Sequence, residues 1–124
     1  MWVYEKRLQF PVNIKRPDPK AAQIIISQYG GPDGEMGASM RYLSQRYSMP
    51  DNKVAGLLTD IGTEELAHLE IVATMVHQLT RNLTPEQIMN SGFAPYYTDH
   101  TVGVWPQAAG GIPFNACEFQ VKGE

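Results

Sequence analysis

The stretch KVAGLLTDIGTEELAHLEIVATMVHQLTR, residues 53–81, decides the fold. It contains no proline, and its apolar residues recur at steps of three and four, which is the period of an α-helix. Pro50 and Asp51 precede it and mark its start. At about 1.5 Å per residue, roughly 30 residues form a rod near 45 Å long. We therefore predict one long helix over residues 51–81.

The sequence before this rod predicts an extended arm and a second helix. Prolines interrupt residues 1–18 and forbid a continuous helix there. Asp18 and Pro19 then supply an N-cap and a first-turn proline for a helix over residues 19–48. The triplet Gly30-Gly31-Pro32 is costly inside a helix, so we expect a kink or a break at this point.

The sequence after the rod predicts one short helix and then irregular chain. Thr84-Pro85-Glu86-Gln87 has the residues of a capping box, which favours a helix over residues 84–90. Residues 91–124 are rich in glycine, proline and aromatic residues, and we expect an irregular or extended segment. Within it, an alternating pattern typical of a short strand is formed by Cys117, Phe119 and Val121.

Composition narrows the class of protein. A length of 124 residues predicts a single domain, and a net charge of -3 without basic clusters argues against nucleic-acid binding. One cysteine excludes an intramolecular disulfide. We find neither a signal peptide nor an apolar run long enough to span a bilayer, which predicts a soluble cytoplasmic protein without membrane contact.

Two long helices cannot cover their own apolar faces, because helical bundles normally need three or four rods around a core. We therefore expect half of a four-helix bundle, an all-α fold made of two long antiparallel helices. Either two copies of the chain pair, or the natural chain continues past Glu124.

Two polar residues interrupt the apolar stripe of the long helix. The stripe, which we expect to be buried throughout, consists of Val54, Leu58, Ile61, Val72 and Met75, with Glu65 and His68 in the middle. A lone carboxylate is costly in an apolar interior, and a cation held by Glu65 and His68 would remove that cost. The alternative is structural: His68 as a hydrogen-bonded core residue, and Glu65 in an ion pair.

The first long helix repeats the interruption. Glu35, Ala38 and Tyr42 share one face of this helix. The apolar residues Ile24 and Leu43, before and after them, suggest that this face belongs to the core. One Glu, together with a Glu-x-x-His motif on a neighbouring helix, is half of the inward-facing ligand set of a dinuclear carboxylate site in a four-helix bundle. Two such interruptions on two helices favour metal binding.

Two strings, LTDIGTEELAHLEIVATMVHQL (58–79) and GGPDGEMGASMRYLSQRY (30–47), closely resemble the manganese catalases. Within that family the chain is most similar to the bacterial spore-coat manganese-catalase-like proteins, and MWVYEKRLQFPV (1–12) and GGIPFNACEFQVKGE (110–124) extend the likeness over essentially the whole chain. The resemblance implies a ferritin-like bundle that holds two manganese ions and disproportionates hydrogen peroxide. It also raises the spore coat as a location.

The resemblance also implies roles for particular residues. Glu35 would be a ligand to one metal, Glu65 the carboxylate that bridges both, and His68 a ligand to the same metal as Glu35. Tyr42 would form hydrogen bonds beside the site, although its alternative role is to fill the core with its hydroxyl at the edge. Manganese is the expected metal, and iron accepts the same ligands.

This chain departs from the family pattern in two ways. The family supplies its second metal with a further Glu and His from two more helices that would follow Glu124, and His77 and His100 are poor substitutes for them. Some members bind calcium through an acid at the position of Asp60 and another one turn earlier, but Gly56 stands there, so calcium is not expected. A half-ferritin-like dimer that binds metal and a non-catalytic coat component therefore remain alternatives to a catalase-like enzyme.

Overall fold

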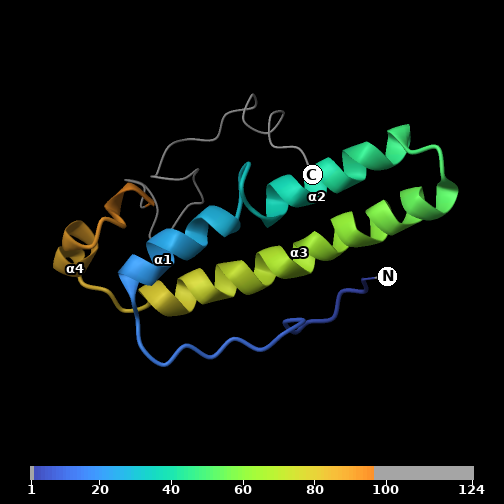
Figure 1. Ribbon diagram of the computed structural model, residues 1–124. Helices are drawn as coiled ribbons and strands as arrows, with labels where there is room; N and C mark the ends of the chain where they lie inside the picture. The colour runs from blue at the N-terminus through green and yellow to red at the C-terminus, as the bar shows by residue number, and fades with distance from the viewer. Residues whose placement is uncertain (1, 97–124) are drawn as a thin grey trace.

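A computed structural model describes residues 2–96, which form a helical hairpin with an N-terminal arm (Figure 1). The rod is α3, Asn52–Thr80, 29 residues long. Two shorter helices run back along it: α1, Pro19–Ile25, and α2, Glu35–Gln45. Each continues into a 3-10 turn, η1 at Ile26–Gln28 and η2 at Arg46–Ser48. The described chain ends with α4, Pro85–Asn90, and η3, Ala94–Tyr96.

The described residues contain no strand, which confirms the all-α prediction. None of their helices is both long and apolar enough to cross a bilayer. Polar caps begin the helices where the sequence predicts them. Asp51 accepts hydrogen bonds from the backbone N–H of Lys53 and of Val54, at 2.7 and 3.1 Å. Thr84 and Gln87 form the expected capping box of α4, which satisfies backbone donors that a helix start leaves unpaired.

The expected break in the helix over residues 19–48 separates α1 from α2. Gly31 has φ 89, a backbone conformation that favours glycine, and residues 29–34 turn sharply. The break also resets the helical phase. Ile24, expected in the core on the phase of Glu35, is therefore 66% exposed, whereas Ala22 of α1 and Ile26 of η1 are buried.

The hydrophobic core lies at the carboxyl half of α3. It is formed by Ala22, Ile26, Val72, Val76, Leu79, Phe93 and Tyr96. The Phe93 and Tyr96 rings stack with their centroids 4.9 Å apart. The first residues of the segment expected to be irregular thus form a 3-10 turn and cover one end of the core. The strand expected at Cys117, Phe119 and Val121 lies outside the described residues.

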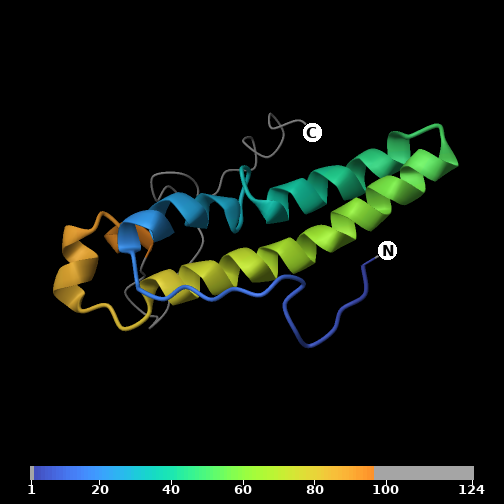
Figure 2. The same cartoon turned by 60° about the horizontal axis from the view of Figure 1, so that its bottom comes forward.

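The N-terminal arm lies along α3 and is bound to it by hydrogen bonds (Figure 2). The Gln78 side chain accepts a hydrogen bond from Ile14 N–H at 2.7 Å and donates one to the Val12 carbonyl at 3.0 Å. Arg81 donates to the Ile14 carbonyl at 2.6 Å. The side chains of α3 thus satisfy backbone groups of a segment that has no regular structure of its own.

The prediction that the apolar stripe of α3 is continuously buried is wrong. Only Val72 of its five apolar members is buried; Leu58, Ile61 and Met75 are half-buried, and Val54 is 39% exposed. The reason is that α1 and α2 cover one side of α3, and the arm covers another, while the side that carries Val54 stays open. Leu57, on the same side, is 56% exposed.

Candidate metal centre

Small residues bring α2 and α3 close together beside the candidate site. The buried Ser39 hydroxyl donates a hydrogen bond to the Gly62 carbonyl at 2.6 Å. A β-carbon on Gly62 would lie 2.8 Å from Leu43 Cγ and 3.2 Å from Tyr42 Cβ, so the two helices approach too closely for a side chain here. Glu35 lies one turn before Ser39, and Glu65 lies one turn after Gly62. This register therefore places the two carboxylates opposite each other.

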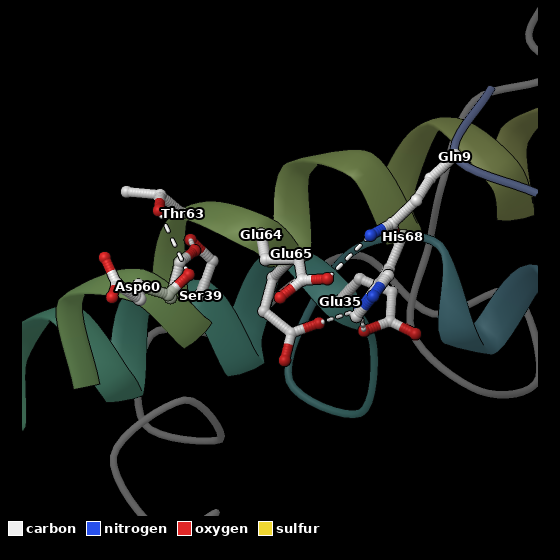
Figure 3. A network of polar contacts seen from close by, with 9 residues as sticks. Gln9, Glu35, Ser39, Asp60, Thr63, Glu64, Glu65 and His68 are labelled. Atoms are coloured by element: carbon white, nitrogen blue, oxygen red, sulfur yellow. Dashed lines mark hydrogen bonds and ion pairs between the residues drawn. The ribbon is translucent and has the colours of Figure 1, made fainter. Parts of the chain in front are cut away.

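The structure brings Glu35, Glu65 and His68 together (Figure 3). One ligand atom from each lies within 4.8 Å of the others. His68 Nδ1 is 2.7 Å from Glu65 Oε2 and 3.9 Å from Glu35 Oε2. The side chains are 28% exposed for Glu35, 10% for Glu65 and 37% for His68. The cluster is thus deepest at Glu65 and opens to solvent at His68.

These three residues fit a divalent metal ion in distance and in charge. Carboxylate and imidazole donors lie about 2.0–2.2 Å from a bound transition metal, so two ligands of one ion are at most about 4.4 Å apart. Side-chain shifts of a few tenths of an ångström would bring all three donors into that range. Two carboxylates balance the charge of a divalent cation, and this mixture of oxygen and nitrogen donors suits manganese and iron.

The direct contact between His68 and Glu65 supplies the structural alternative. His68 Nδ1 lies 2.7 Å from the Glu65 carboxylate, so this nitrogen donates a hydrogen bond to Glu65 in the tautomer that carries its proton there. A metal at this position would replace that proton, since imidazole binds metal through an unprotonated nitrogen. The half-open position of His68 leaves a path for such an exchange.

The other residues considered from the sequence are less closely connected with the cluster. Tyr42 is half-buried beside Gly62, and its hydrogen-bonding role stays a prediction. His77 is exposed, as expected, and His100 lies outside the described residues. Asp60, the acid considered for calcium binding, is half-buried on α3. Gly56, one turn earlier, has no side chain to serve as a second calcium ligand, and the space around it is open.

One hydrogen bond next to the cluster has no counterpart among the sequence patterns. Gln9 of the arm donates a hydrogen bond to Glu64 at 2.6 Å (Figure 3). Gln9 and Glu64 are 55 residues apart in sequence, so no local pattern predicts the pair. Two adjacent glutamates of α3 therefore have different surroundings: Glu64 is paired with the arm, and Glu65 faces Glu35 and His68.

This chain is similar in sequence to a known protein family and to several of its members. A family profile described as manganese containing catalase matches residues 1–124. Protein CotJC of Bacillus subtilis is 53% identical over 124 residues, which are 100% of this chain and 65% of CotJC. A protein named "Probable manganese catalase" from Clostridium acetobutylicum is 32% identical over 126 residues, covering 100% of this chain and 56% of that protein.

A solved structure supports the same relationship. Wild-type KatB, a manganese catalase from Anabaena, matches with a TM-score of 0.77 and 28% sequence identity, over 95% of this chain and 52% of KatB. The chain spans between about half and two thirds of the length of these relatives. On its sequence and its fold, the chain belongs to the manganese-containing catalase family.

Proposed function

We propose that this chain supplies half of a dinuclear manganese centre and that the completed centre disproportionates hydrogen peroxide. The observation that carries the proposal is the convergence of Glu35, Glu65 and His68, from two helices, to within 4.8 Å. Family membership supports manganese as the metal. The second half of the centre would come from further chain or from a second copy, because three protein ligands are too few for two ions.

Within this proposal Glu35 would hold one metal, Glu65 would be the carboxylate shared between the two metals, and His68 would complete the coordination of the first. The burial of Glu65 supports the bridging role, since a carboxylate with both oxygens on metal ions loses little by leaving water. Nδ1 is the His68 nitrogen that faces the carboxylates, so binding requires this atom to be unprotonated and leaves the imidazole proton on Nε2.

The reaction converts two molecules of hydrogen peroxide into two of water and one of oxygen. A manganese pair, when bound, supplies the two-electron redox change that both half-reactions require. The residues of this chain hold the ions and balance their charge with hard oxygen donors, which stabilise manganese in its higher oxidation states.

Location in the spore coat belongs to the same proposal. It rests on the sequence resemblance and on the 53% identity to CotJC. A coat component without catalysis, and a half-ferritin-like dimer that binds manganese or iron, would use the same helices. Metal analysis separates these alternatives.

The test is metal content per chain, measured by elemental mass spectrometry on protein purified without chelator. We expect about one manganese per chain, and the Glu65→Gln variant should lose it. Glu64→Gln is the matched control, because it changes the neighbouring glutamate, which is paired with Gln9 and lies outside the cluster. Protein that binds no metal even after manganese is added, or equal losses in both variants, would contradict the proposal.

A second assay, oxygen release from hydrogen peroxide, tests catalysis separately. Manganese without oxygen release would retain the metal site and reject the activity for this chain. Iron bound in preference to manganese would favour the half-ferritin-like alternative.

A further inference from the structure

The Ser39 hydroxyl makes a contact of a different kind from those of the other serine and threonine hydroxyls in α2 and α3. Each of the others donates to the carbonyl four positions earlier in its own helix, at 2.7 to 3.0 Å; these are Ser44, Thr59, Thr63, Thr74 and Thr80. That is the common hydrogen bond of a serine or threonine inside a helix. Ser39 instead donates to the Gly62 carbonyl of the neighbouring helix, at 2.6 Å (Figure 3).

The surroundings of this hydrogen bond make it difficult to replace. Ser39 is buried, so water does not compete for its hydroxyl. Gly62 is also buried, and it has no side chain that would keep α2 away from its carbonyl. A β-carbon at Gly62 would lie 2.8 Å from Leu43 Cγ, so the two backbones are already close at this point. The hydroxyl therefore joins α2 to α3 where the helices approach each other closely.

This contact lies one helical turn from each candidate carboxylate ligand. Glu35 is four positions before Ser39 on α2, and Glu65 is three positions after Gly62 on α3, so each pair lies along one face of its helix. When no metal ion is bound, the negative charges of Glu35 and Glu65 repel each other and favour separation of the two helices. The Ser39 hydrogen bond opposes that separation and keeps the ligand atoms of the cluster within 4.8 Å of one another.

We infer that Ser39 is a positioning residue of the metal centre, whose hydroxyl fixes the separation of Glu35 and Glu65 before metal binds and so sets the affinity and selectivity of the site. This inference rests on the proposed function and adds to it the residue that controls the choice of metal. Ligands that are already in place lose less freedom when the ion binds. Fixed geometry is also how a site favours manganese over zinc, which binds intrinsically more tightly to the same donors.

The test measures the Kd of the chain for Mn²⁺ and for Zn²⁺ by isothermal titration calorimetry, at a temperature where the metal-free chain is fully folded. We expect Ser39→Ala to raise the Kd for manganese roughly tenfold. Zinc has no geometric preference of its own, so its Kd should rise roughly threefold or less. The preference for manganese therefore falls. A role in packing alone would lower Tm and leave the ratio of the two Kd values unchanged.

Ser44→Ala is the matched control. It removes a hydroxyl from the same helix, but this hydroxyl is exposed and donates to the Met40 carbonyl of its own helix at 2.7 Å. The control should keep the wild-type Kd for both ions. Ser39→Cys is a second variant with a similar shape and a weaker donor, so its manganese Kd should lie between those of wild type and Ser39→Ala. Circular dichroism checks that each variant is helical before metal is added.

Three other results would overturn the inference. Equal manganese Kd values for wild type, Ser39→Ala and Ser39→Cys would show that the hydroxyl does not position the ligands, and would leave the proposed function intact. Equal losses of manganese and zinc affinity, or the same loss in Ser44→Ala, would reduce Ser39 to a packing residue of α2. A wild-type chain that binds no manganese would reject the proposed function itself, and the inference with it.

Discussion

Two glycines of α3 allow the packing beside the metal ligands to be tested with a matched pair of substitutions. A β-carbon on Gly56 would meet nothing within 4 Å, whereas one on Gly62 would lie 2.8 Å from Leu43 Cγ and 3.0 Å from Leu43 Cδ2. Both residues are inside the same helix, so replacement by alanine gives each the same gain in helix propensity, about 0.5–1 kcal/mol. Only Gly62→Ala adds a steric conflict.

The size of that conflict follows from the atoms involved. Leu43 Cγ is a branch point close to the backbone. It can move away from a new β-carbon only if the whole Leu43 side chain changes its rotamer or α2 itself shifts. Overpacking of this kind typically costs about 1–3 kcal/mol. We therefore expect Gly56→Ala to raise the free energy of unfolding by about 0.5–1 kcal/mol, and Gly62→Ala to be about 1–3 kcal/mol less stable than Gly56→Ala.

Thermal and urea unfolding of the chelator-treated chain, followed by circular dichroism, measure this difference. For a domain of this size, 1 kcal/mol corresponds to roughly 3–6 °C in Tm. Manganese titration of the same samples tests the link to the site: displacement of α2 moves Glu35 away from Glu65, so Gly62→Ala should bind manganese more weakly while Gly56→Ala is unchanged. Equal stability and equal affinity in the two variants would refute the close approach of α2 and α3.

Three further predictions follow from the site and the arm. Glu65→Leu should leave the metal-free chain at least as stable as wild type, because it removes a carboxylate from an apolar stripe, and should abolish any rise in Tm on adding manganese; a large loss of stability without metal would contradict this. Manganese at about 100 times its Kd should stabilise the wild-type chain by about 2.7 kcal/mol, and chelator should reverse the shift in Tm. Gln78→Leu removes both hydrogen bonds to the arm, at 2.7 and 3.0 Å, and should cost about 1–3 kcal/mol and speed proteolysis within residues 1–18; an unchanged cleavage rate would show that the arm is held by other contacts.

Local signals in the sequence were sufficient to predict where these helices begin. Asp18, Asp51 and Thr84 each cap a helix whose start they predict, because capping depends on residues only two or three positions away. The break after Gly30 was predictable for the same reason. The exposure of Ile24 was not predictable, because the geometry of the loop between α1 and α2 decides how the faces of the two helices are aligned.

Contacts between residues far apart in the sequence could not be predicted from local sequence patterns. The hydrogen bonds of the arm join residues 55 to 67 positions apart, and they depend on single polar side chains such as Gln78 and Arg81. The candidate site is an exception among long-range features. Two carboxylates and a histidine interrupt otherwise apolar faces, and such interruptions are visible in sequence because burying a charge needs a reason.

The spacing between the candidate ligands depends on residues that carry no metal-binding chemistry. A β-carbon on Gly37 would collide with the Gly31 carbonyl oxygen, and one on Gly34 would lie 2.9 Å from the Gln28 backbone. These glycines let the turn after η1 fold tightly onto the first turn of α2, where Glu35 lies. Gly62 does the same for the approach of α3. Substituting any of the three would keep every candidate ligand in the sequence and still separate Glu35 from Glu65, so retention of the Glu and His residues alone is not sufficient evidence for a working site in a related chain.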